Sequence, residues 1–127
     1  MTIEQHLDKL NPEFAAYLRS KWNAAQMAAD LDDLDIKIVC SRRTAKQQAA
    51  LYAKGRTAPG PKVTWTLNSR HLDGNAVDLG LFRKGVYMDE GNNALTYRVY
   101  LKIWKVWKHP RMKWLGNVGD PCHFEWH

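Results

Sequence analysis

The sequence predicts an α+β fold, with a short and mainly antiparallel sheet packed against about three helices. Two observations predict this class. Segments with apolar residues at helical spacing are separated by short runs of alternating polarity. These segments also follow one another without a regular strand–helix–strand rhythm. A length of 127 residues fits one domain, so we expect a single domain over residues 1–127.

Helices are expected at 11–29, 44–55 and 93–108, where apolar residues recur every three to four positions. Asn11 can cap the first helix, and Pro110 stops the third. The sequence thus predicts two long helices and one shorter helix between them.

Strands are expected where short runs place apolar residues at alternate positions. They cover residues 35–41, 75–82, 112–115 and 123–126, and a turn at 83–85 leads into an extended segment at 86–88. Between 56 and 68, two prolines and a glycine predict a long surface loop with a short strand at 63–66. Long loops in compact domains often carry function.

The composition excludes several classes of protein. Hydrophobic residues make up 45% of the chain and charged residues 25%, as in ordinary globular proteins. No run of about 18 apolar residues occurs, so we expect no stable membrane association. The first residues lack the basic flank and apolar core of a signal peptide. We therefore expect the protein to stay in a cytoplasm unless something else releases it.

The formal net charge of +6 favours polyanionic partners, among them nucleic acid, anionic lipid and an acidic cell wall. The lysines and arginines are scattered, with local clusters at 42–43 and 102–113. No recognised nucleic-acid-binding motif accompanies them, so we do not expect nucleic acid as a partner.

Two stretches carry the residues that suggest chemistry: 69–78, with the sequence SRHLDGNAVD, and 120–125, with the sequence DPCHFE. Together they supply His71, Asp78 and His123, two imidazoles and a carboxylate of the kind that zinc binds. Three protein ligands leave the fourth position of a tetrahedral zinc open for water, as hydrolysis needs. We therefore expect one Zn²⁺ per chain.

The spacing of these residues suits a loop that is followed by a strand. His71 and Asp78 are seven residues apart, too far for one helical turn, and Gly74 allows a close or left-handed turn between them. On the last strand, the period of two places His123 and Glu125 on the same face. Glu125 can therefore orient a ligand imidazole.

Two carboxylates compete for the role of general base. Asp120, three residues before His123, can take a proton from water and pass it to a leaving amine. Glu125 is the alternative base.

The two cysteines are expected to be reduced thiols. Cys40 ends an apolar run and is expected to be a small core residue. Cys122 is not expected to bind metal, because the adjacent His123 is the better partner for His71 and Asp78.

Other aromatic side chains lie outside these stretches. Trp22, Trp104 and Trp107 fall in amphipathic helices and are expected in the core. Trp65, in the long loop, is the best candidate among the tryptophans for a substrate contact. His6 is expected to be an ordinary surface or core residue.

Residues 69–78 resemble the Ser-x-His-x-x-Gly-x-Ala-x-Asp signature of the M15 zinc peptidases. That group includes D-alanyl-D-alanine peptidases and phage L-alanyl-D-glutamate endopeptidases. Residues 120–123 resemble its closing acid-x-x-His motif, and residues 43–60 resemble the arginine–helix–loop element of the phage-endolysin branch. The resemblance spans about residues 35–126. Residues 114–119 depart from it, because they are shorter than the Trp-Gly-Gly-Asp-Trp-like stretch that phage members often carry.

The resemblance implies that zinc is held by His71, Asp78 and His123, and that Asp120 is the catalytic acid/base. It thereby favours Asp120 over Glu125 for proton transfer.

The resemblance also implies that Arg43 contacts the substrate or the developing oxyanion, a role that a permanent guanidinium cation suits. Arg42 is the adjacent candidate, and alternation suggests that only one of the two faces the cleft. Ser69 can hydrogen-bond within the site or stabilise its loop.

Together these features predict a phage-type endolysin: a monomeric zinc endopeptidase that cuts the stem peptides of peptidoglycan between L-Ala and D-Glu. It would stay in the host cytoplasm until release to the periplasm or cell wall. No separate wall-binding domain is expected, so the basic charge would supply attraction to the wall. The alternatives are a D-alanyl-D-alanine carboxypeptidase of the same family and a non-catalytic basic module that binds nucleic acid or wall.

Overall fold

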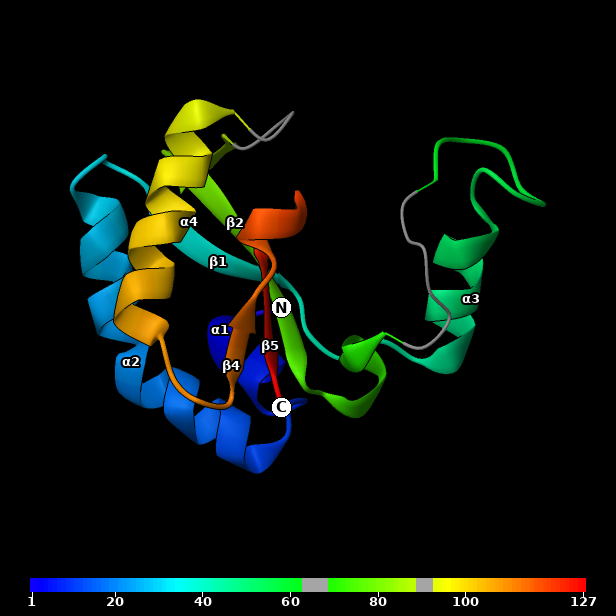
Figure 1. Ribbon diagram of the computed structural model, residues 1–127, viewed down its shortest axis with the longest axis horizontal. Coiled ribbons are helices and arrows are strands. Elements are labelled where there is room, and N and C mark those ends of the chain that lie inside the picture. Colours follow the sequence, from blue (N-terminus) through cyan, green and yellow to red (C-terminus); the bar gives the residue numbers. More distant parts are fainter. Residues whose placement is uncertain (63–68, 89–92) are drawn as a thin grey trace.

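The computed structural model describes residues 1–62, 69–88 and 93–127, and these contain a five-stranded antiparallel sheet (Figure 1). The strand order is β1-β2-β5-β4, and β3 pairs with one end of β2. The strands are β1 (Asp35–Cys40), β2 (Ala76–Arg83), β3 (Val86–Tyr87), β4 (Met112–Trp114) and β5 (His123–Trp126). Strand β2 therefore lies between β1 and β5.

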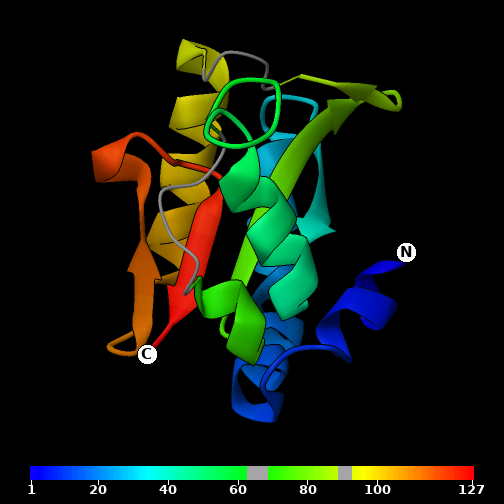
Figure 2. The same cartoon turned by 90° about the vertical axis from the view of Figure 1, so that its right-hand side faces the viewer.

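Four α-helices occur in the same described residues. They are α1 (Ile3–Leu7), α2 (Pro12–Asp30), α3 (Ala45–Ala53) and α4 (Ala94–Trp107), with 3-10 helices η1 (Arg70–Asp73) and η2 (Gly116–Val118). Helices α2 and α4 pack together on one face of the sheet, whereas α3 and η1 lie in front of the opposite face (Figure 2). None of these helices is long and apolar enough to cross a membrane. The arrangement confirms the expected α+β class.

Helix α1 is a fourth helix that the sequence pattern does not predict. With five residues it is too short for helical spacing to stand out. A capping box begins it: Thr2 accepts a hydrogen bond from the Gln5 backbone, and the Gln5 side chain accepts one from the Thr2 backbone. The helix buries His6 and Leu7 and packs against β1.

The three expected helices begin close to the predicted positions, and the predicted cap Asn11 begins the first of them. The side chains of Asn11, Thr44 and Asn93 each accept a hydrogen bond from a backbone N–H in the first turn. These caps satisfy donors that the helix leaves unpaired, which is why they mark the helix starts well. The short strand expected at 63–66 lies outside the described residues.

The hydrophobic core lies between the sheet and the layer of α2 and α4. Its largest wholly buried side chains include Phe14 of α2, Trp107 of α4 and Trp126 of β5. Trp107 is thus a core residue, as expected. Trp22 and Trp104 are only half-buried at the edge of the core, because their helix positions turn partly towards solvent.

Three neighbouring strands place side chains in one row across the sheet. Cys40 of β1 is aligned with Asp78 of β2, and Asp78 is aligned with His123 of β5. The register of β1 shifts between Ile38 and Cys40, so the end of this strand departs from regular pairing. The row brings together residues that are far apart in the sequence.

Candidate metal centre

Helix η1 delivers His71 to the row of strand residues. The Ser69 side chain caps η1 by accepting a hydrogen bond from the His71 backbone N–H at 3.2 Å. Gly74 ends η1 with a φ of 71°, in the left-handed region that favours glycine. A Cβ at this position would lie 2.9 Å from the Lys9 carbonyl oxygen, so glycine also allows the N-terminal segment to approach.

Three side chains meet at the end of this row. The Nε2 atom of His71 lies 3.2 Å from Oδ2 of Asp78, and the Nδ1 atom of His123 lies 2.9 Å from Oδ1. The two imidazole rings stand edge to face, with centroids 5.1 Å apart. The His71 side chain is 1% exposed, Asp78 17% and His123 9%. The predicted zinc ligands therefore converge in a mostly buried site.

Hydrogen bonds behind the two imidazoles set which nitrogen faces the centre. Nδ1 of His71 donates to the Ser41 carbonyl oxygen at 2.5 Å, and Nε2 of His123 donates to Glu125 at 2.8 Å. In the neutral rings, the opposite nitrogens then carry lone pairs that face Asp78. This is the arrangement in which metal-binding histidines are held by outer partners.

Nε2 of His71 provides a test of whether a metal fits. It is buried and has no hydrogen-bond partner among the described residues, because its 3.2 Å approach to Asp78 is not aligned as a hydrogen bond. Buried polar atoms are rarely left unpaired. Two imidazole nitrogens and a carboxylate also match zinc chemically. The residues present therefore fit this metal.

Charge is concentrated on these groups even in the metal-free chain. Burial lowers the pKa of His71, but Asp78 and Cys40 outweigh burial and raise it to about 10. Burial raises the pKa of Asp78, but the hydrogen bond with His123 and the positive charges of both imidazoles outweigh burial and hold this pKa well below its usual range. Burial likewise lowers the pKa of His123, and its bond with Asp78 reverses the direction. The centre is thus built to hold positive charge around one carboxylate.

Asp120 borders the centre on its open side, with a side chain that is 52% exposed. Its Oδ2 atom lies 4.0 Å from Nδ1 of His123, and its Oδ1 atom accepts a weak hydrogen bond from the Cys122 thiol at 3.4 Å. Partial burial and the charge of Asp78 raise the pKa of Asp120. A carboxyl group with a raised pKa suits proton transfer better than an ordinary one.

Glu125 lies on the other side of His123. Its carboxylate accepts hydrogen bonds from His123 at 2.8 Å and from His127 at 2.6 Å. Burial raises the pKa of Glu125, but these two bonds outweigh it and lower the pKa. Both oxygens are engaged, which suits a group that orients an imidazole rather than one that exchanges protons.

Arg43 also reaches the centre. Its guanidinium lies 3.4 Å from Oδ2 of Asp78 and donates to the side chain of Gln48 at 3.0 Å. Its backbone N–H donates to the His71 carbonyl oxygen at 3.0 Å. Gln48 is wholly buried, a polar residue on the inner side of α3. This burial indicates that Gln48 has a structural role at the centre. Sequence periodicity alone does not reveal that role.

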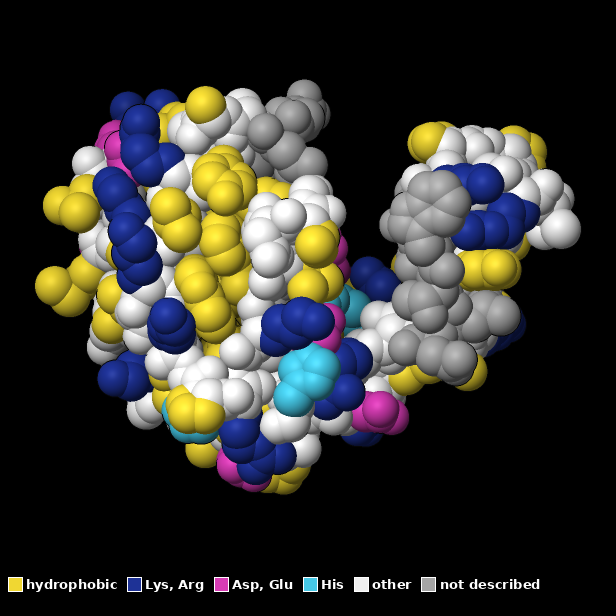
Figure 3. Space-filling model, in the orientation of Figure 1, with side chains coloured by type: hydrophobic (Ala, Val, Ile, Leu, Met, Phe, Trp, Pro, Cys, Tyr) yellow, Lys and Arg dark blue, Asp and Glu magenta, His cyan; other side chains and the backbone are white. Residues whose placement is uncertain are grey.

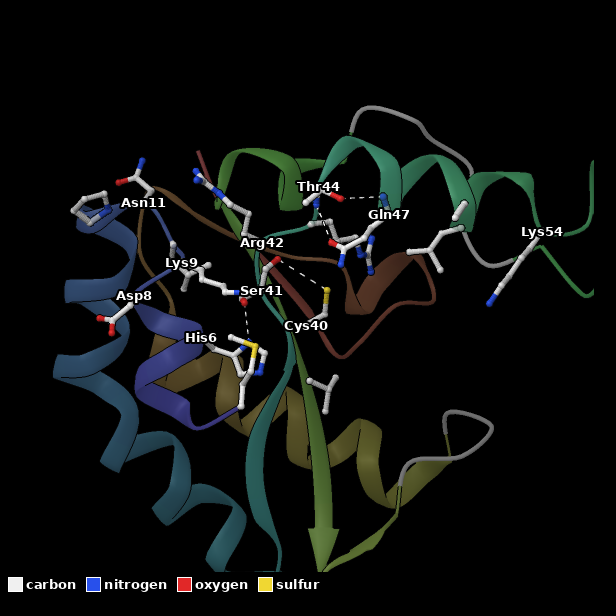
Figure 4. A pocket seen from close by; sticks show the side chains of 17 residues that line it. His6, Asp8, Lys9, Asn11, Cys40, Ser41, Arg42, Thr44, Gln47 and Lys54 are labelled. Atoms are coloured by element: carbon white, nitrogen blue, oxygen red, sulfur yellow. Dashed lines mark hydrogen bonds between the residues drawn. The ribbon is translucent and has the colours of Figure 1, made fainter. Parts of the chain in front are cut away.

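Two of the predicted substrate contacts, Arg42 and Ser69, are not brought to the centre. Arg42 is exposed and donates to the Asp73 carbonyl oxygen at 3.1 Å, which braces η1. It lines a groove of about 970 Å³ between α1 and α3 (Figure 4). Ser69 takes the capping role. Trp65 lies outside the described residues and stays a prediction.

Cys40 departs from the expected core position. It is half-buried, and its sulfur lies 3.7 Å from Nδ1 of His71. The atoms of Cys40, His71 and Asp78 are close enough to hold an ion, as are those of Asp78, Asp120 and His123. Because Nδ1 of His71 already donates to Ser41, the thiol lies behind the ring and not on the side of the free nitrogen.

Sequence patterns also did not predict the contact that links His6 to the candidate metal centre. Its ring is buried, and its Nδ1 atom lies 2.7 Å from the Ser41 hydroxyl (Figure 4). A chain of contacts thus runs from α1 through His6 and Ser41 to the His71 imidazole. No local pattern signals it, because the partners are 35 and 30 residues apart.

Comparison with solved structures gives a parallel for the fold. The chain is similar to the crystal structure of the L-Ala D-Glu endopeptidase ChiX of Serratia marcescens, with a TM-score of 0.68 and 20% sequence identity. The match covers 99% of this chain and 86% of that chain. No protein-family model and no curated protein matches. At this identity, the likeness shows a shared fold.

Proposed function

We propose that this protein is a zinc-dependent peptidase of the M15 type that hydrolyses the stem peptides of peptidoglycan at the L-Ala–D-Glu bond. The observation that carries the proposal is the convergence of two imidazole nitrogens, from positions 71 and 123, on the Asp78 carboxylate beside Asp120. The fold shared with an L-Ala D-Glu endopeptidase supports it.

The metal would be held by His71 through Nε2, by Asp78, and by His123 through Nδ1, one Zn²⁺ per chain. When bound, zinc acts as a Lewis acid and lowers the pKa of water towards neutrality. The protein prepares the orientation of the site in advance, because Ser41 and Glu125 already accept hydrogen bonds from the ring nitrogens that would face away from the metal.

Asp120 is the proposed general acid/base. Its raised pKa and its open position next to His123 allow it to accept a proton from the attacking water and return it to the leaving amine. Glu125 is assigned the orienting role, because both of its oxygens already accept hydrogen bonds.

Arg43 would clamp a substrate carboxylate or stabilise the tetrahedral oxyanion. The hydrogen bond with Gln48 limits the positions of its guanidinium, and its half-buried side chain (19% exposed) strengthens its charge interactions. Gln48 thus serves as a positioning residue for this cation.

The same chemistry supports a lytic role on the bacterial wall. A cell-wall peptidase that is made in a host cytoplasm and acts only after release is a phage endolysin. We propose that role, a single catalytic domain over residues 1–127, a monomeric state and peptidoglycan as the partner. The net charge of +6 would attract the protein to the anionic wall.

Product masses from digested peptidoglycan test the proposal. Purified sacculi are incubated with the protein, and the soluble products are identified by mass spectrometry. Fragments with a new amino group on D-Glu, together with L-Ala left on the muramyl residue, are the expected products. Loss of terminal D-Ala alone would assign the carboxypeptidase reaction instead.

Metal analysis tests the zinc assignment separately. We expect one zinc per chain, loss of hydrolysis on chelation and recovery when zinc is restored. His71→Ala should abolish both zinc binding and hydrolysis. A protein that contains no stoichiometric zinc and binds sacculi equally well after chelation would support the non-catalytic binding module.

A further inference from the structure

The outer face of α4 carries aromatic and apolar side chains that the core buries only in part. Tyr97, Leu101 and Trp104 recur at spacings of four and three, so they lie along one side of the helix, and Trp114 of β4 lies beside them. Tyr97 is 40% exposed, and the other three are half-buried. We call these four residues the aromatic platform. The face of the molecule in Figure 3 has a broad apolar area bordered by a line of lysines and arginines.

The rings of the platform are held in fixed positions. Trp114 stacks on Trp104 at 6.3 Å with 22° between the planes, and Tyr97 lies 5.8 Å from Trp114. The Trp114 indole donates to the Pro121 carbonyl oxygen at 2.6 Å. Gly116 leaves the space for this ring, because a Cβ there would lie 1.9 Å from it. A surface fixed in this way loses little conformational entropy on binding a rigid partner.

A hollow of about 320 Å³ continues the platform beyond the C-terminal end of α4. Its lining comprises Trp104, Lys108, His109, Pro110 and Met112. It combines apolar and aromatic side chains with two polar groups, the composition of a small-ligand subsite.

Positive charge lies along a border of the platform. Helix α4 contains Arg98, Lys102 and Lys105 and no acidic residue. Arg98 and Lys102 share Asp32 as a partner, at 3.4 and 3.1 Å. Two cations on one carboxylate leave a net positive edge, which attracts a partner that carries carboxylates.

We propose that the aromatic platform and its hollow bind the glycan strand of peptidoglycan. This inference rests on the proposed function. Pyranose rings have flat C–H faces that stack on indole and phenol rings, and the peptides attached to the strand carry carboxylates for the lysines. The substrate polymer of the proposed reaction combines both features. Fixed, half-buried rings suit such rigid sugars better than the mobile acyl chains of a membrane.

The platform lies on the α4 side of the sheet, and strands β4 and β5 and the segment that leads to Asp120 connect it with the candidate metal centre. Trp114 is aligned with Phe124, the neighbour of His123, and the Asp120 backbone N–H donates to the Leu115 carbonyl oxygen at 3.0 Å. A glycan held here would lie beside the segment that carries Asp120. The platform thereby raises the local concentration of substrate, as a second binding module would.

Binding of peptide-free glycan strands tests the inference. The strands are prepared from sacculi with an amidase, and binding is followed by tryptophan fluorescence. Tyr97→Ala and Trp104→Leu should each weaken binding about tenfold. Tyr87→Ala is the matched control, because Tyr87 is 46% exposed on β3 and its ring contacts Phe82 of β2, and this variant should bind as the unmodified protein does. If Trp104→Leu fails to fold, Tyr97→Ala decides the outcome.

A ratio of rates separates this inference from the proposed function. For Tyr97→Ala, the rate on sacculi divided by the rate on a sugar-free stem peptide should fall about tenfold. A wild-type protein that binds glycan but hydrolyses neither substrate would reject the proposed function and keep the glycan site. Equal glycan binding by Tyr97→Ala and the unmodified protein would overturn the inference. So would binding to anionic vesicles without binding to glycan, or a platform-dependent dimer in sedimentation.

Discussion

The Nε2 atom of His71 lies 3.2 Å from the Oδ2 atom of Asp78 inside a buried site. When His71 is neutral, its proton is on Nδ1 and is donated to Ser41, so two lone pairs face each other. A positive charge between them relieves this repulsion. That charge is a proton in the metal-free chain and Zn²⁺ in the proposed enzyme.

Zinc binding should therefore release protons. The pKa of His71 in the metal-free chain is raised to about 10, so the ring is protonated at pH 7 and must lose that proton to bind zinc. Apparent zinc affinity should rise about tenfold per pH unit below this value while one proton is displaced. Calorimetry in buffers of different ionisation enthalpy counts the protons. Zinc affinity that does not vary between pH 6 and 8 would contradict this assignment.

Asp120→Asn should keep the zinc and lose turnover. The amide cannot exchange a proton, so kcat should fall about 10²- to 10⁴-fold, while metal content stays at one per chain. Glu125→Gln is the comparison, because it keeps the shape but weakens the hold on His123. It should lower zinc affinity about tenfold or more. A fully active Asp120→Asn variant would move the acid/base role to Glu125.

His6→Ala should lower zinc affinity without touching the metal. His6 holds the Ser41 hydroxyl, and the Ser41 carbonyl oxygen holds the His71 imidazole. We expect a loss of about tenfold or less, measured by competition with a chromogenic chelator. His6→Asn places an amide near the former Nδ1 position and should restore most of the affinity. An equal loss of affinity in both variants would assign His6 a packing role only.

Cys40→Ala should leave one zinc per chain. The thiol lies beside Nδ1 of His71, which Ser41 already occupies, and not beside the free Nε2. Metal analysis after dialysis against a weak chelator measures the stoichiometry. Loss of the zinc on this substitution would place Cys40 among the ligands.

Lysis of sacculi should weaken as salt rises. The net charge of +6 acts over a screening length that falls from about 10 Å at 0.1 M salt to about 3 Å at 1 M. Turbidity of a sacculus suspension follows the rate, and hydrolysis of a soluble stem peptide is the control for direct salt effects. Wall binding that is independent of salt would show that the net charge does not contribute to the attraction.

The helices and the strands could be predicted because their signals are local. Asn11, Thr44 and Asn93 cap helices through hydrogen bonds to residues two or three positions away. Helix α1 escaped prediction because five residues are too few for a periodic signal. We expected Trp104 in the core because its helix is amphipathic, but it is only half-buried. The width of the buried stripe of a helix depends on what packs against it, which the sequence pattern does not show.

The sequence by itself determined most of the elements, the types of chemical group and the expected ligands His71, Asp78 and His123. Motif spacing and side-chain chemistry suffice for these. Only the tertiary structure decided which atoms face one another: that Ser41 and Glu125 select the imidazole nitrogens, that Arg43 and not Arg42 reaches Asp78, and that Cys40 lies behind His71. These contacts join residues on separate strands and helices, so they depend on sheet register and helix packing, which no local stretch of sequence encodes.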